Sequence, residues 1–148
     1  MDYTTLVRIH ASLLFASLAA LLAAEVLIAG VRTDRSALAR VVLVANRTSH
    51  MLAGVGLLAG LALVITGPWP LLTPWLLLSL ALIGLWAMVA RTWVRPWMLA
   101  LEGAIGAGDG VAALSRDKRA LLGRVAFLAL YVSIMAVMFK KPYIPSPF

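Results

Sequence analysis

The chain has 148 residues and no cysteine, which excludes disulfides, thiolate metal sites and thiol redox chemistry. Charged residues are scarce, at 13% of the chain, and only six residues are acidic. Histidine occurs twice, and no complete motif for catalysis, for a metal or for a cofactor is present. The sequence therefore offers few groups for chemistry, and function has to be inferred from weaker patterns.

Apolar residues are abundant instead, at 63% of the chain, more than a water-soluble fold of this size can bury. They form four long blocks, and about 20 helical residues suffice to cross a hydrocarbon core of about 30 Å. The period-two alternation of a membrane barrel is absent. We therefore predict a single-domain, all-α polytopic membrane protein with four transmembrane helices in an up-down-up-down bundle. The expected spans are residues 6 to 31, 41 to 66, 75 to 95 and 120 to 139, followed by a Pro-rich tail at residues 142 to 148.

The distribution of basic residues predicts an orientation. Of the 13 lysines and arginines, ten lie in or beside the two polar turns: Arg32, Arg35, Arg40, Arg47, Arg91, Arg95, Arg116, Lys118, Arg119 and Arg124. Because basic residues accumulate in cytoplasmic loops, we expect both turns inside and both termini outside. The net charge of +7 is then explained by topology, so we expect membrane lipids and other membrane-protein subunits as partners, and no nucleic acid.

Composition adds a compartment to this topology. Arginine exceeds lysine, and alanine and leucine are abundant, as is typical of a bacterium with a GC-rich genome. The start of the chain lacks the basic region of a cleaved signal peptide, so the first block is expected to be retained as a span. The predicted location is the bacterial cytoplasmic membrane.

The two histidines are the candidates for a cofactor site. His10 lies in the outer third of the first span, where an ionisable side chain is costly and often functional. It is interpreted either as an axial ligand of haem b or as a histidine bonded to a backbone carbonyl or water. Folding the first hairpin about Asp34 places His50 level with Leu18, about 12 Å along the axis from His10. That offset argues against one iron bound by both histidines, and the cofactor remains open.

Glu25 is the only acidic residue deep within a span. The same folding places it opposite Leu43, within reach of Arg40 or Arg47. Because buried charges are normally paired, we expect an ion pair that locks the hairpin. The alternative, a proton relay, lacks the further acids and histidines that such a path needs.

Small residues recur at four-residue spacing on both helices of this hairpin: Gly56 and Gly60 on the second span, and Ala16, Ala20 and Ala24 on the first. Such spacing lets helix backbones approach closely, so we expect the two helices to pack through these residues. The alternative is a smooth surface that accommodates a porphyrin edge near His10.

The tail after the fourth span is expected to be extended. Pro145 and Pro147 restrict its backbone, which lowers the entropy lost when such a segment docks. Tyr143, Ile144 and Phe148 would serve as apolar anchors. We therefore predict that the tail contacts a partner chain.

Several short motifs carry a family resemblance. They are His10 early in the first span, the arginine-bearing first turn, Thr73-Pro74-Trp75-Leu76 at the start of the third span, and the closing Met138-Phe139-Lys140-Lys141-Pro142. On these motifs the chain resembles a bacterial family of four-span membrane proteins of unknown function, which implies fold and location rather than activity. It is more loosely similar to four-span haem-binding protoporphyrinogen oxidases and to the membrane domain of copper-resistance proteins, which also place a histidine early in a span.

Two functions are consistent with these patterns. We favour a non-catalytic accessory or assembly subunit of a larger inner-membrane complex, respiratory or photosynthetic. The alternative is a haem b-binding membrane redox protein that uses His10 as axial ligand. The absorption spectrum of the purified protein would separate them.

Overall fold

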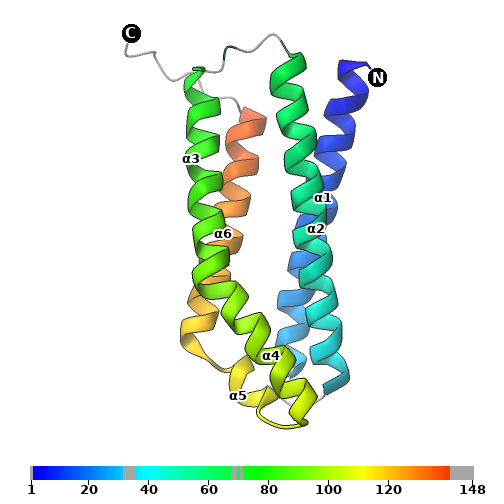
Figure 1. Cartoon of the computed structure of the whole chain (residues 1–148), viewed down its shortest axis with the longest axis vertical. Coiled ribbons are helices and arrows are strands. Elements are labelled where there is room, and N and C mark those ends of the chain that lie inside the picture. Colours follow the sequence, from blue (N-terminus) through cyan, green and yellow to red (C-terminus); the bar gives the residue numbers. More distant parts are fainter. Residues whose placement is uncertain (1, 32–35, 68–69, 71, 141–148) are drawn as a thin grey trace. The chain divides into compact units, whose positions relative to one another are not determined.

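The computed structural model describes all residues except 1, 32–35, 68–69, 71 and 141–148. Most of the described residues are helical, and none of them lies in a strand (Figure 1). The elements are α1 (Tyr3–Val31), α2 (Ser36–Thr66), α3 (Pro74–Val89), the π-helical turn η1 (Ala90–Val94), α4 (Arg95–Ala107), α5 (Val111–Ser115) and α6 (Lys118–Lys140). Four helical stretches are long and apolar enough to cross a membrane, namely Tyr3–Ile28, Ala37–Thr66, Pro74–Ala107 and Lys118–Lys140. The structure thus indicates a multi-pass, all-helical membrane protein.

The chain divides into two compact units. Unit 1 comprises Met1–Pro68 and Ala100–Arg116, and unit 2 comprises Trp69–Leu99 and Asp117–Phe148. Unit 1 therefore holds α1, α2, the second part of α4 and α5. Unit 2 holds α3, η1, the first residues of α4, and α6.

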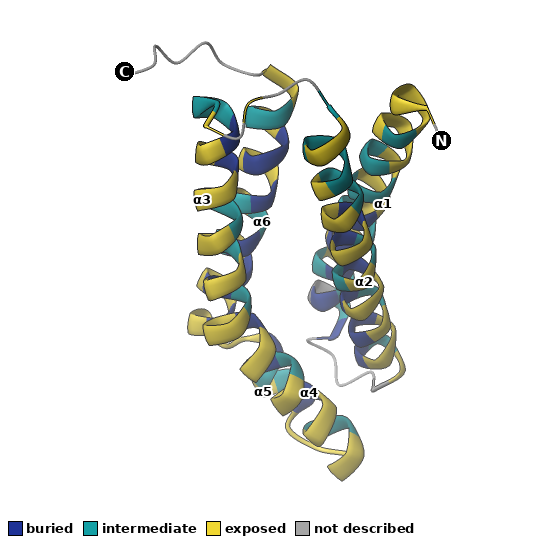
Figure 2. Ribbon diagram, turned by 45° about the horizontal axis from the view of Figure 1, so that its top comes forward, coloured by how far each residue is buried: buried dark blue, intermediate teal, exposed yellow. Residues whose placement is uncertain are grey.

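Unit 1 is built on the α1/α2 pair, which lies side by side in Figures 1 and 2. Asp2 precedes α1 and caps it, because its carboxylate accepts hydrogen bonds from the backbone N–H and the hydroxyl of Thr5. Buried residues then recur every three or four positions and form one stripe on each helix (Figure 2). The stripe on α1 is Ser17, Leu21, Ala24, Ile28 and Val31, and that on α2 is Val42, Asn46, Ser49, Ala53 and Gly56. This spacing is the one that keeps a helix face turned toward its neighbour.

Unit 2 is built on the α3/α6 pair. Pro74 occupies the first turn of α3, where its missing N–H leaves no bond unmade. Trp86 of α3 contacts Phe127 and Tyr131 of α6. Gly123, which precedes Phe127 on α6, lies against Trp93, which follows Trp86 in the chain. The two helices are therefore antiparallel.

The π-helical turn η1 explains why the third helix is longer than the sequence predicts. The backbone N–H of Arg95 bonds the carbonyl of Ala90, five residues earlier. Pro96 follows, and proline has no N–H and clashes with the carbonyl four residues before it. A wider turn relieves that clash, so the helix continues to Ala107 instead of ending near residue 95. Gly108, with φ of 80°, then ends it, because glycine accepts the left-handed conformation.

Candidate functional site

His10 makes the first polar contact between α1 and α2. Its Nδ1 lies 2.7 Å from the backbone oxygen of Gly56. Because a carbonyl oxygen only accepts hydrogen bonds, Nδ1 carries the proton and donates it. In the neutral ring the lone pair is then on Nε2, which is the atom available to a metal or a second hydrogen bond.

The His10 ring rests in a notch on α2 formed by the missing side chain of Gly60. A Cβ at position 60 would lie 2.7 Å from Cε1 and 3.1 Å from Nδ1 of the ring, closer than atoms can pack. Gly56 has the same role one turn earlier, since a Cβ there would lie 2.9 Å from Leu14 Cδ2. The two glycines thus hold His10 and Leu14 of α1 directly against the α2 backbone.

A pair of serines makes the second polar contact. The Ser17 hydroxyl donates to the backbone oxygen of Ser49 at 2.8 Å, and the two hydroxyl oxygens are 3.1 Å apart. Both side chains are buried. Hydrogen bonds between membrane helices contribute about 0.6 kcal/mol on average and up to about 2 kcal/mol. We call His10, Ser17, Ser49 and the Gly56 carbonyl the polar seam.

The polar seam also fixes the register of the hairpin. His10 meets Gly56, and Ser17, two turns later on α1, meets Ser49, two turns earlier on α2. The helices are therefore antiparallel. His10 lies between Gly56 and Gly60, at the level of Leu58 that folding about Asp34 predicts.

Asn46 is fully buried next to the seam on α2. Its amide nitrogen donates to the Val42 oxygen at 3.1 Å, while its Oδ1 has no hydrogen-bond partner among the described residues. The Asn46 backbone oxygen lies 2.7 Å from Nδ1 of His50. His50 thus bonds its own helix, one turn back.

The structure does not assemble a bis-histidine site. His50 precedes Gly56 by six residues, or about 9 Å along the helix, while His10 is held at Gly56 itself. Within the part of the chain that the structure describes, no group of three or more His, Asp or Glu side chains is placed to hold a metal ion.

Glu25 was expected to pair with Arg40 or Arg47, and Arg47 pairs with Glu102 instead. The Arg47 guanidinium contacts both carboxylate oxygens of Glu102 at 2.8 Å, with both side chains at least half exposed. Folding the hairpin about its turn determines the position of a residue along the helix axis. It does not determine the side of the helix on which that residue lies. Arg40 and Arg47 are both exposed, off the buried stripe of α2, whereas Glu25 is half-buried in α1. A pair between Glu25 and Arg40 stays a prediction.

The small-residue face needs a similar correction on α1. Gly56 and Gly60 do face α1, and Ala24 is fully buried. Ala20 is half-buried and Ala16 is exposed. The buried stripe of α1 passes through Ser17, one residue after Ala16, so Ala16 lies outside the packed face.

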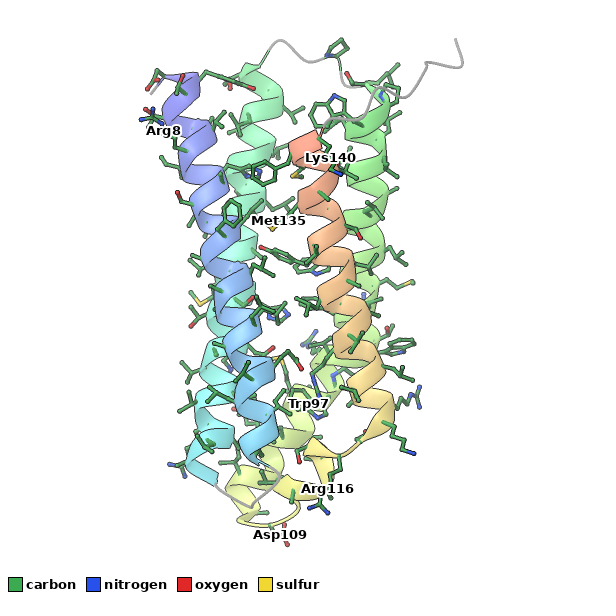
Figure 3. The ribbon with its side chains drawn as sticks, turned by 180° about the vertical axis from the view of Figure 1, so that it is seen from behind. Arg8, Trp97, Asp109, Arg116, Met135 and Lys140 are labelled. Carbon is green, nitrogen blue, oxygen red and sulfur yellow. The ribbon has the colours of Figure 1, made fainter. Side chains whose placement is uncertain are left out.

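Unit 2 contains a second cluster, which sequence reasoning missed. Arg124 is buried, and its guanidinium carbon lies 4.5 Å from the centre of the Trp97 ring. Trp86 stacks on Phe127 with ring centres 4.7 Å apart and meets Tyr131 edge-on at 5.8 Å. Figure 3 shows Trp97 near one end of the α3/α6 pair and Lys140 at the other.

The Trp97 ring of this cluster holds the guanidinium of Arg124. A desolvated guanidinium over an indole face contributes about 2 kcal/mol. The signal in the sequence was the spacing of Arg124, Phe127 and Tyr131, which places the arginine on the same face as the two aromatic residues. All three are buried.

The predicted docking residues Tyr143, Ile144 and Phe148 lie outside the described residues. No family model, no curated protein and no solved structure matches the chain. The function is therefore inferred from the two sites alone.

Proposed function

We propose that the chain is a non-catalytic accessory or assembly subunit of a larger electron-transfer complex in a bacterial cytoplasmic membrane. The observation that carries this proposal is the use made of the polar groups inside the spans. His10, Ser17 and Ser49 bond across the α1/α2 hairpin, and Arg124 is held on an aromatic face. These groups serve to hold helices together, which suits a scaffold better than a catalyst.

The orientation proposed for this subunit follows from charge. Four spans return the chain to the side on which it began, so both termini share one side of the membrane. The two basic turns then face the cytoplasm and the termini face outward. Reporters that are active in only one compartment, fused after Phe148 and within residues 106 to 110, test this. Opposite signals with the cytoplasmic one at residues 106 to 110 support the orientation, and a cytoplasmic signal at Phe148 overturns it.

The accessory role is tested in the native membrane. The tagged chain is extracted in a mild detergent and its size is compared on native gels with that of a form lacking residues 143 to 148. We expect the full chain to migrate in a complex of fixed stoichiometry and the shortened form to be released with unchanged helical content. Migration of the full chain alone would refute the accessory role. Retention of the shortened form in the complex would refute docking by the tail.

Haem binding through His10 is the second candidate, and one observation favours it. The bond from Nδ1 to the Gly56 carbonyl fixes the ring and directs the lone pair to Nε2, as in many imidazole ligands of metals. A haem iron would supply electron transfer when bound, and His10 would be its single histidine ligand in this hairpin. A Soret band in the purified protein that His10→Ala abolishes would establish this function, and its absence after expression with haem supplied would exclude it.

A further inference from the structure

The exposed face that runs from α3 through η1 to the start of α4 carries an arginine pair at one end. Arg91 and Arg95 are four residues apart and both are exposed, so they lie one turn apart on the same side of the helix, with Cβ atoms about 6 Å from each other. The residues one turn to either side, Ala87 and Leu99, are uncharged. Neither arginine has a carboxylate partner among the described residues. Two like charges at this spacing repel each other, and an anion between them would remove that repulsion.

An apolar track continues from this pair along the same face. Its residues recur every three or four positions and are exposed: Leu77, Leu80, Gly84 and Met88. The opposite face is the buried one, with Leu76, Ser79, Val89 and Val94, so the track points away from α6. Figure 2 shows exposed residues along this side of α3.

Gly84 leaves the middle of this track without a side chain. A Cβ built there meets no atom within 4 Å, while Leu80 and Met88, one turn on either side, are more than half exposed. Leu77, at the far end of the track, lies about 21 Å from Arg91 at 1.5 Å per residue, and the hydrocarbon half-thickness is about 15 Å. The track is thus long enough to cover one lipid leaflet when the arginines lie at headgroup level.

We propose that Arg91 and Arg95 bind the phosphate of an anionic phospholipid whose acyl chain lies along the track over Gly84. The charge of the pair selects the headgroup, because two guanidinium groups present donors in a fork that fits phosphate oxygens. A zwitterionic lipid such as phosphatidylcholine also carries a cationic group, which these arginines repel. The apolar track selects a lipid over a free phosphate, since a free anion gains nothing from it.

Native mass spectrometry of the full chain in mild detergent tests the proposal, with phosphatidylglycerol and phosphatidylcholine of equal chain length as probes. We expect retention of one phosphatidylglycerol and no phosphatidylcholine. The double substitution Arg91→Gln/Arg95→Gln should weaken retention about 25-fold, a factor of about five for each charge removed at a membrane surface. The matched control is Arg8→Gln/Lys140→Gln, which removes the same charge from two other exposed sites and should leave retention within about twofold.

Two further measurements separate a lipid site from simpler explanations. Glycerol phosphate, which has the headgroup anion and no acyl chain, should fail to displace the lipid. Gly84→Leu should reduce retention while leaving helical content unchanged, because the position is open. Equal losses in both double variants would show a diffuse electrostatic attraction and overturn the proposal. Displacement by glycerol phosphate, or full retention in Gly84→Leu, would overturn the acyl track.

Discussion

The contact between His10 and Gly60 gives a quantitative test of the hairpin. Gly60→Ala places a methyl group 2.7 Å from Cε1 of the ring, so the ring has to move by several tenths of an ångström. The bond from Nδ1 to the Gly56 oxygen, now 2.7 Å, is then strained or lost. Overpacking costs about 1 to 3 kcal/mol and the lost bond about 0.6 to 2 kcal/mol, while alanine gains about 1 kcal/mol over glycine in a helix. We expect Gly60→Ala to destabilise the protein by about 1 to 3 kcal/mol.

A double-mutant cycle isolates this contact. In a His10→Ala background the ring is gone, so Gly60→Ala should be neutral or stabilising, and the coupling energy should reach at least about 1 kcal/mol. Gly54→Ala is the matched control, because a Cβ there meets nothing within 4 Å. Stability is measured by titrating the protein from mild micelles into dodecyl sulfate and following helical circular dichroism. Equal effects of Gly60→Ala with and without His10 would refute the packing that we describe.

Three further predictions concern other contacts. Gly123→Ala should destabilise unit 2 by about 1 to 3 kcal/mol in the same titration, because the new Cβ would lie 2.6 Å from Trp93 Cβ, an atom that no side-chain rotation can move. Arg47→Gln should change stability by less than about 1 kcal/mol, since the pair with Glu102 is more than half exposed on the arginine side; a larger loss would mean that the pair is shielded from solvent. Hydrogen bonds from the hydroxyl and the backbone N–H of Thr5 hold the pKa of Asp2 below its ordinary value of 3.8. The cap therefore contributes above that value and is lost as the pH falls through the lower pKa of the folded state, which faster amide exchange at that threonine would report and Asp2→Ala would abolish.

In this protein the sequence predicts the position of a residue along its helix axis better than the side of the helix on which the residue lies. Apolar length and a short polar turn determine which segments pair and at what level, so the level of His10 on α2 was predicted correctly. The direction in which a side chain points depends on the packing of two particular helices, and apolar residues on every side of a membrane helix hide that choice. For this reason Ala16 was expected on the packing face of α1, where Ser17 lies instead. Arg47 was likewise named as one of two candidate partners of Glu25, although it pairs with Glu102.

The end of the third helix could not be predicted from the sequence, for a different reason. Arginines and Pro96 interrupt its apolar pattern, and each is an ordinary sign that a helix ends. The π-helical turn accommodates the proline without a break, and such a turn has no clear signature in a single sequence. Arg124 was treated as one more basic residue of the polar turn before the fourth span. Its contact with Trp97 depends on the π-helical turn, which the sequence does not reveal.

The π-helical turn also sets the rotation of Trp97 relative to α3. A π turn holds one more residue than the α-helical turn it replaces, so deletion of one residue within Ala90–Val94 would restore an ordinary helix and leave Trp97 on nearly the same side. Straightening the turn without a deletion would instead rotate Trp97 by about 100° relative to α3 and carry it away from Arg124. The aromatic cluster therefore tolerates the loss of one residue from this segment, whereas a substitution that converts the π turn to an α-helical turn would separate its two halves.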